Sequence, residues 1–378
     1  MKDILWILCK TIVRICVAGI LIYSAVSSFI LPWISLYFPS EKMHETDTSQ
    51  LEYSSSFNGL DTDSIILSSP STAADLEHFG YELFSNVSQQ QNGTNIFLSP
   101  TSIALALSMC IAGARDETLN QALRVLHASS IEALTKTVEQ IMHMISMTAH
   151  NKKGIWKNRF PEILTKKADF YEANGHISKI DVMFQTGKYA YAENNDLHAQ
   201  IAHLPYQSDN ENIQFAFTVI LPKQDISLDE VERKLALQPD LMQLVLSDHN
   251  TSMTELLLYL PKFKMKASLK LDDVLKQLGM ENAFNSTANF TGITSQQDGE
   301  DGIFISEVIH KAFIDVNEQG TKAAAATAGV TSVLFSATAL KPMPILFKAD
   351  RPFLFFIRES RQNIVLFSGK LVSPPSAL

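Results

Sequence analysis

The chain has 378 residues, of which 46% are hydrophobic and 19% charged, with a formal net charge of −9. This length allows one large or two medium domains with a substantial core. The negative charge, and the lack of a basic patch with interleaved aromatic residues, exclude a general nucleic-acid binder. Cys9, Cys16 and Cys110 are the three cysteines, and the first two lie in an apolar N-terminal segment. The body therefore has one thiol, predicted to be a buried helical residue, and no internal disulfide.

The N-terminal segment is predicted to be a membrane anchor. Residues 1–14 include the basic residues Lys10 and Arg14. Residues 15–38, which follow, are uncharged and mostly apolar. That stretch is long enough to cross a bilayer. The positive charges place residues 1–14 in the cytoplasm and the rest of the chain outside. The alternative is a signal peptide cleaved near Ala25, in which case the protein is secreted.

Residues 39–72 are rich in Ser, Thr and Asp and are predicted to form a flexible stalk. The folded domain is expected at 73–378. Five acceptor sequons lie beyond the anchor and predict an extracellular or lumenal glycoprotein. Their asparagines are Asn86, Asn92, Asn250, Asn285 and Asn289.

The first part of the folded domain has the patterns of helices. In residues 73–87, Leu76, Phe79, Leu83 and Phe84 share one helix face. A short strand is expected at 95–100, followed by an all-round apolar, buried helix at 102–114. Amphipathic helices are expected at 116–126 and 129–147, the second capped by Ser130.

From about residue 177 the sequence favours β-structure. The predicted strands are 188–194, 199–206, 215–222, 255–265, 303–316, 351–357 and 363–372. One helix is expected among them at 269–280, with Gly279 at its C-terminal cap. Helices first and mostly antiparallel strands later predict an α+β fold.

No enzyme motif is present. The chain lacks Gly-x-Ser-x-Gly, a phosphate loop, Gly-x-Gly-x-x-Gly and His-Glu-x-x-His. His198 and His203 are read as ordinary histidines rather than as a metal pair. The sequence therefore predicts no catalytic residue, no cofactor and no metal.

The stretch EQGTKAAAATAGVTSVLF, residues 318–335, puts four alanines between two segments typical of strands. Alanine has the highest helix propensity, so propensity alone predicts a short surface helix. The segments on either side of the alanines favour an extended conformation instead. In the upstream KAFIDVNE, Ala312, Ile314 and Val316 alternate with Phe313, Asp315 and Asn317 as in a strand.

Several motifs, in order, resemble one family, the serpins, which are mostly serine protease inhibitors. NIFLSPTSIALALSMCIAGARDETLNQAL resembles the segment in which a strand enters the family's buried helix B. IFISEVIHKAFIDVNEQGTKAAAATA resembles the approach to the reactive loop, and ADRPFLFFI with LFSGKLVSP resembles the C-terminal signature. The similarity runs from Ala73 to Pro374, and the hinge and C-terminus resemble the ovalbumin-like branch most.

The resemblance implies a serpin-like fold with an exposed reactive loop at 320–345 and a hinge at 318–328. In this family a protease cuts the loop, which then inserts into sheet A as a new strand. Serpins are the standard example of this insertion of a loop into a sheet. Thr321, Ala323, Ala325 and Thr327 would face inward on insertion, and Gly320 permits the turn out of the preceding strand. The implied hinge residues are Glu318, Gly320, Thr321, Ala323, Ala324, Ala325, Ala326 and Thr327. The implied shutter and breach residues are Ser99, Ser102, His310 and Trp156.

The family's usual spacing from Gly320 places the bait bond at Leu334–Phe335. Either residue suits the large apolar pocket of a chymotrypsin-like protease. Because the segment from Leu334 to Pro352 is longer than usual, the bond could instead lie near Ala339 or Leu340. Lys341 would suit a trypsin-like protease, but Pro342 follows it.

The chain departs from the family at an apparent internal deletion near residues 147–154. A complete serpin has several dozen residues between its fourth helix and the Gly-x-Trp found here at Gly154 and Trp156. The absent block would supply the first three strands of sheet A and two helices. Sheet A is therefore expected to be incomplete, and the strand at 309–316 to keep an unpaired edge.

Two functions remain open at this point. One is a monomeric, membrane-tethered inhibitor, the suicide bait of an extracellular chymotrypsin- or elastase-like serine protease. The other is a non-inhibitory serpin-like binding or scaffold protein, which the absent strands favour. A hydrolytic enzyme is excluded because no nucleophile arrangement is present.

Overall fold

The computed structural model describes residues 70–147, 154–208, 212–293, 303–321 and 343–375. The predicted anchor at 15–38 and most of the predicted stalk lie outside this range. Among the described residues, no helix combines the length and the hydropathy that a bilayer crossing requires.

Helices dominate the first part of the domain, and strands the remainder. The α-helices are α4 (Pro70–Gln90), α5 (Pro100–Ile111), α6 (Asp116–Val125), α7 (Ile131–Met147), α8 (Leu228–Leu237), α9 (Pro239–Leu246) and α10 (Asp272–Gln277). The strands are β1 (Ile96–Leu98), β2 (Lys166–Tyr171), β3 (Ile177–Asn194), β4 (Ala199–Pro205), β5 (Phe215–Pro222), β6 (Ser252–Pro261), β7 (Phe263–Lys270), β8 (Ile309–Val316), β9 (Ile345–Lys348), β10 (Phe353–Glu359) and β11 (Ile364–Leu371). The described ranges also contain three short 3-10 helices, at Glu162–Leu164, Asp248–Asn250 and Asn282–Phe284.

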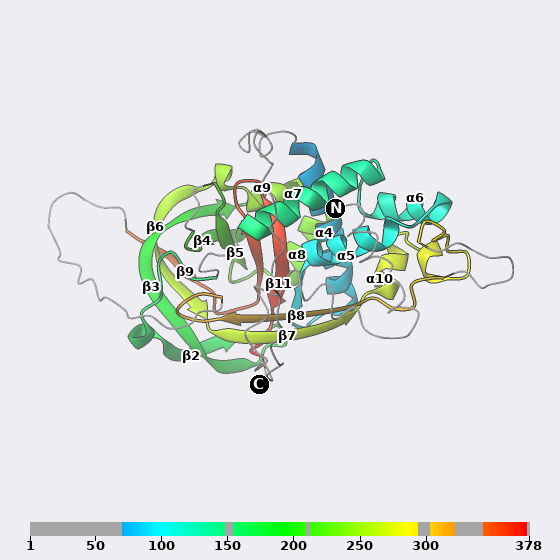
Figure 1. Ribbon diagram of the computed structural model, residues 1–378. Coiled ribbons are helices and arrows are strands. Elements are labelled where there is room, and N and C mark those ends of the chain that lie inside the picture. The colour runs from blue at the N-terminus through cyan, green and yellow to red at the C-terminus, as the bar shows by residue number, and fades with distance from the viewer. Residues whose placement is uncertain (1–69, 148–153, 209–211, 294–302, 322–342, 376–378) are drawn as a thin grey trace, which may run out of the picture.

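The strands form two sheets of very different size. The larger has nine strands in the order β1-β11-β10-β5-β4-β3-β6-β9, with β2 paired to β3. The smaller contains two strands among the described residues, β7 and β8. All pairs are antiparallel except β6 with β9, which are parallel. In Figure 1 the long strands β3 and β6 curve around one side, helices α4 to α7 lie on the other, and β7 and β8 run along the lower edge. The predicted α+β fold is confirmed.

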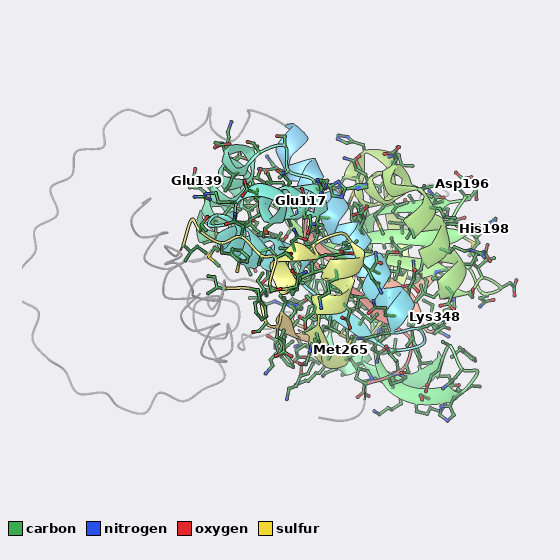
Figure 2. The ribbon with its side chains drawn as sticks, turned by 90° about the vertical axis from the view of Figure 1, so that its right-hand side faces the viewer. Glu117, Glu139, Asp196, His198, Met265 and Lys348 are labelled. Carbon is green, nitrogen blue, oxygen red and sulfur yellow. The ribbon has the colours of Figure 1, made fainter. Side chains whose placement is uncertain are left out.

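Figure 2 shows from a second direction where helices α6 and α7 lie relative to the turn between β3 and β4. Glu117 and Glu139, on α6 and α7, lie at the opposite side of the molecule from Asp196 and His198, in the turn between β3 and β4 (Figure 2). Helices α6 and α7 therefore lie at one end of the molecule, whereas α8 lies at the other, where Lys234 Nζ donates to Asp196 O at 2.9 Å.

The central strands are buried from end to end. Every residue of β5 and β10 is buried, which explains why Phe353–Ile357 and most of β5 are apolar without alternation. Phe355 on β10 lies at the middle of an aromatic cluster. Its ring stacks on Phe97 and Phe217, with centroids 5.9 and 5.4 Å away. Gly369 on β11 faces the same ring, and a Cβ there would lie 2.3 Å from it.

Local patterns determine most of the helices. The predicted face of α4 is confirmed, since Leu76, Phe79, Leu83 and Phe84 are all buried. Ser130 caps α7, because its Oγ accepts a hydrogen bond from the Ala133 N–H at 3.1 Å. Gly279 lies one residue beyond the cap of α10 with φ of 113°, the left-handed conformation that ends a helix.

Some expectations were wrong in detail. The strand expected at 255–265 is two strands, β6 and β7, because the chain passes between the two sheets at Lys262, whose N–H donates to Asp181 O at 2.8 Å. Residues 303–308 are irregular, so β8 begins at Ile309, and residues 269–270 belong to β7 rather than to the helix. Cys110 is half-buried on α5 rather than buried. Helices α8 and α9 and strand β2 were not predicted.

Phe355→Ala is expected to destabilise the fold by about 3–5 kcal/mol, because a buried ring is removed from a close-packed cluster. The measurement is the free energy of unfolding in guanidinium chloride. The control is Ile163→Ala, at a side chain that is 84% exposed, with an expected change below about 0.5 kcal/mol. Equal effects of the two substitutions would contradict the importance of this cluster.

Candidate functional site: the hinge and shutter around strand β8

Ser99 connects the start of helix α5 to strand β8. As the N-cap of α5, its Oγ accepts from the Ser102 N–H at 3.2 Å. The same hydroxyl donates to Leu366 O on β11 at 2.7 Å. The Ser99 N–H donates to His310 Nε2 on β8 at 3.1 Å. The predicted shutter residues Ser99 and His310 are therefore in contact, and Ser102 takes part through its backbone.

His310 is a buried, neutral acceptor. The side chain is 9% exposed, and burial lowers its pKa to about 4. Because Nε2 accepts the Ser99 N–H, the proton of the neutral ring is assigned to Nδ1. Protonation of Nε2 would remove this acceptor and place two N–H groups against each other.

Sequence reasoning missed Thr101, which adds a second link from α5 to β11. Its Oγ1 is buried and donates to Val365 O at 2.6 Å. Threonine at this helix position carries no recognisable pattern, since the acceptor is 264 residues away.

The turn after β8 is held by the segment that contains Trp156. The Trp156 indole N–H donates to Asn317 O at 2.8 Å, and its backbone N–H donates to Gln319 O at 3.0 Å. The Thr321 N–H donates to Gly154 O at 2.6 Å. Trp156, which the resemblance implies as a shutter or breach residue, thus contacts the turn that follows β8.

Gly320 is required by close backbone contact. It forms bridges with Ile155 and Asn317, and its φ is 153°. A Cβ at this position would lie 1.7 Å from the Gly154 carbonyl oxygen, a distance that no substitution can accommodate without moving the backbone. Glycine is therefore needed for proximity as well as for conformation.

The same segment joins the hinge to the large sheet. Trp156 pairs with Tyr206, just after β4, and their rings stack with centroids 4.8 Å apart. The Tyr206 hydroxyl is hydrogen-bonded to the Thr321 hydroxyl. Burial raises the pKa of Tyr206 well above its ordinary value, so the phenol is neutral. Sequence reasoning missed Tyr206, because only the fold brings residues 206 and 321 together.

Glu318 is a buried carboxylate with a cationic partner. Its side chain is 7% exposed and lies 2.9 Å from Lys262 Nζ, and Thr165 Oγ1 donates to it at 2.8 Å. Burial opposes ionisation, but the hydrogen bonds from Lys262 and Thr165, together with a backbone hydrogen bond, hold the pKa of Glu318 below its ordinary value. The Phe160 N–H donates to Glu318 O at 2.9 Å, so both the side chain and the backbone are fixed.

Strand β8 pairs on one side only within the described part of the chain. Its partner is β7, in a register from Ile309–Lys270 to Val316–Phe263. The alternation expected for KAFIDVNE is confirmed, because Ile314 and Val316 are buried while Phe313 is 38% exposed. The unpaired edge presents backbone N–H and C=O groups that another strand can bind.

The remainder of the predicted hinge and loop lies outside the described residues. This applies to Ala323, Ala324, Ala325, Ala326 and Thr327, and to the bait residues Leu334 and Phe335. The described chain resumes at Met343, and Ile345 already belongs to β9. The loop expected at 320–345 therefore ends one residue earlier than predicted.

The five sequon asparagines differ in exposure. Asn92, Asn250 and Asn285 are exposed, whereas Asn86 and Asn289 are half-buried. In the sequon of Asn86, the Ser88 hydroxyl is buried and hydrogen-bonded to Glu232 and Lys370, which makes this asparagine the least suitable acceptor. Asn285 and Asn289 each accept hydrogen bonds from the threonine two residues on.

A protein-family model described as Serpin (serine protease inhibitor) matches residues 74–153 and 129–374. The chain therefore belongs to the serpin family, a family of protease inhibitors rather than of enzymes.

Three relatives illustrate the similarity. Human antithrombin-III is 32% identical over 241 residues, covering 64% of this chain and 49% of the relative. Antichymotrypsin-2 of Bombyx mori is 36% identical over 217 residues, covering 57% and 54%. Human leukocyte elastase inhibitor is 32% identical over 262 residues, covering 68% and 66%. The chain spans about half the length of the first of these relatives.

A solved structure shows the same fold. Arabidopsis AtSerpin1 in its native stressed conformation superimposes with a TM-score of 0.68 at 20% identity, covering 81% of this chain and 98% of that one. At this identity the likeness shows the fold alone, and the predicted serpin fold is confirmed.

The burial of His310 is expected to lower the free energy of unfolding as the pH is reduced from about 6.5 to about 4, whereas Glu77, whose pKa burial raises to about 8, contributes with the opposite sign. His310 is neutral in the folded protein down to pH about 4, whereas in the unfolded chain it takes up a proton below about 6.5. At this residue the unfolded state therefore binds more protons in this window, so the contribution of His310 to the free energy of unfolding rises with pH there, by about 3 kcal/mol over the whole window. His203, whose pKa burial and the nearby Arg358 lower to about 3, adds a slope of the same sign.

His310→Gln tests this expectation, because glutamine can still accept the Ser99 N–H but does not titrate. Denaturant unfolding at a series of pH values from 4 to 7 should give a less positive slope than the wild type. The exposed His249→Gln is the control and should leave the slope unchanged. If His310→Gln has the wild-type slope, the burial of His310 does not control this dependence.

Proposed function

We propose that this serpin inhibits a chymotrypsin- or elastase-like serine protease by offering Leu334–Phe335 as bait. The observation that supports this most is the anchoring of Asn317–Thr321 by the Trp156 segment. Hydrogen bonds with Trp156, Gly154 and Tyr206 fix the start of the loop beside the unpaired edge of β8. A loop that begins there can pair with that edge after cleavage.

The composition of the loop supports insertion. Thr321, Ala323, Ala325 and Thr327 are small, so their alternate side chains would fit beneath the helices that cover a sheet. The names of two relatives, antichymotrypsin-2 and leukocyte elastase inhibitor, agree with the apolar bait residues Leu334 and Phe335. The resemblance to the ovalbumin-like branch supports the same assignment.

A second candidate function is that of a non-inhibitory binding or scaffold protein. The specific observation in its favour is the two-strand sheet β7-β8. We propose that the block near residues 147–154 is absent, so that an inserted loop has one neighbouring strand instead of two. It would then gain about half the backbone hydrogen bonds of a strand inserted between two others, and the energy available to trap a protease would be smaller.

Incubation of the domain from residue 70 onward with chymotrypsin, followed by a denaturing gel, tests the inhibitor proposal. The expected result is a covalent band at the summed mass. Ala325→Arg should abolish this band and give cleaved product only, because its side chain would face inward on insertion. Ala324→Arg is the matched control, since that residue alternates outward, and should retain the band.

Thermal unfolding of the cleaved protein distinguishes the two functions. Insertion raises the unfolding midpoint of the cleaved form above that of the intact form. Only clipped protein on the gel, together with an unchanged midpoint, would reject the inhibitor and leave the non-inhibitory candidate.

We also propose that residues 15–38 anchor the protein in a membrane, with the folded domain on the extracellular or lumenal side. The apolar run, Lys10 and Arg14 on its N-terminal side, and the exposed sequons at Asn92, Asn250 and Asn285 support this arrangement.

Expression of the full chain in a secretory system should give protein in the membrane fraction, with N-glycans removable by a glycosidase. Asn285→Gln should remove one glycan, whereas Asn86→Gln should remove none because Ser88 is buried. A mature N-terminus shortly after Ala25, with the protein in the medium, would reject the anchor in favour of a cleaved signal.

A further inference from the structure

Three side chains of types that can bind a metal ion lie close together on the helical side of the molecule, away from the hinge. His78 and Glu82 are one turn apart on α4 and so share a face. His127 lies two residues beyond α6, the helix that carries Glu117 in Figure 2. One ligand atom from each of the three residues lies within 4.8 Å of the other two.

The detailed contacts agree with a shared ligand. His127 Nε2 is 3.0 Å from Glu82 Oε2, and the rings of His78 and His127 have centroids 4.4 Å apart. Within the described part of the chain, His78 Nδ1 is buried and has no hydrogen-bond partner. A buried imidazole nitrogen without a partner is costly, and a metal ion bound through this nitrogen would satisfy it.

The helix end fixes the position of His127. Its φ is 52°, the left-handed conformation common just beyond a helix end, where histidine is one of the more tolerated non-glycine residues. The hydrogen bonds of this helix end, His127 N–H to Arg124 O and Ala128 N–H to Leu123 O, measure 3.1 and 2.9 Å. The backbone is therefore held in place, and the ring contacts Glu82.

We propose that His78, Glu82 and His127 form a zinc site that fastens the turn between α6 and α7 to α4. Zinc bonds of about 2.0–2.2 Å in a tetrahedron place ligand atoms about 3.3–3.5 Å apart. Small rotations of these side chains bring them to that spacing. Two imidazoles and one carboxylate match the ligand preference of Zn²⁺ rather than that of Ca²⁺ or Mg²⁺, which take oxygen ligands.

The site is open on one side. The side chains of His127 and Glu82 are 32% and 40% exposed, so a water molecule can occupy the fourth coordination position. If His127 Nε2 carries a proton toward Glu82, zinc displaces that proton to solvent and takes its place between the two groups. The sequence alone does not reveal the site, because Glu82 and His127 are 45 residues apart and form no known spacing motif.

Titration of the full chain, prepared without a histidine tag, with Co²⁺ and then Zn²⁺ tests the proposal. The expected result is one equivalent of Co²⁺ with the visible absorption of a four-coordinate ion, which Zn²⁺ displaces and which Mg²⁺ and Ca²⁺ do not. Zn²⁺ should also raise the unfolding midpoint.

Three variants locate the binding to this cluster. His127→Asn keeps a residue tolerated at positive φ, while His78→Gln and Glu82→Gln are close in size to the residues that they replace. Each should weaken Co²⁺ binding at least tenfold and abolish the zinc-dependent rise in the midpoint. The control is His176→Asn, since His176 also forms a surface pair with a glutamate, Glu172, at 3.0 Å. It should bind as the wild type does.

Two results would overturn the proposal. One is the absence of Co²⁺ binding by the wild-type chain. The other is wild-type affinity in those of the three variants that unfold cooperatively, which would place the metal elsewhere.

Discussion

The segment from Gly154 to Lys157 joins the two sheets, and the position of the hinge depends on it. On one side Trp156 and Gly154 hold the turn after β8, through Asn317, Gln319 and Thr321. On the other side the Lys157 N–H donates to Pro205 O at 2.9 Å, at the end of β4. The stacked rings of Trp156 and Tyr206 fill the space between. Together with the contacts of Glu318 to Lys262, Thr165 and Phe160, this segment fixes the orientation of the two-strand sheet at its hinge end.

Contacts with the start of helix α5 fix the other end of strand β8, near His310. Ser99 is at once the cap of a buried helix, a donor to β11 and a donor to His310 on β8. These contacts are buried, so each polar group must be paired, and a charge on His310 is unfavourable. The rigidity of the Ser99–His310 contacts and the loss of stability expected at low pH therefore have the same origin, which is the buried neutral imidazole of His310.

The unpaired edge of β8 is where stability and function conflict. A free edge can bind the reactive loop, but it can also bind a second chain, and Phe313 on this strand is partly exposed. With β7 as the partner of β8 in the described structure, loop insertion would add a strand at an edge rather than between two strands. A strand inserted between two others gains more backbone hydrogen bonds than one added at an edge. The larger gain favours a protease trap, and the smaller gain favours a binding protein.

The sequence by itself determined the family, the α+β class and most of the elements. Apolar periodicity, helix caps and turn residues act over a few neighbours, which is why α4, α7 and β5 could be located from local pattern. Motif order was equally informative, since it implies shutter and breach roles for Ser99, His310 and Trp156, and all three lie on β8 or contact it or the turn that follows it. The division of 255–265 into two strands was not predictable, because it depends on which sheet each half joins.

Only the tertiary structure decided which distant groups meet. Tyr206 and Thr321, Lys262 and Glu318, and the cluster of His78, Glu82 and His127 have no local signature. Their contacts depend on how whole sheets and helices pack, and burial then decides which of these groups carry a charge. Local preferences act along the chain, whereas hydrogen bonds and ion pairs between remote residues form only after the core has placed them side by side.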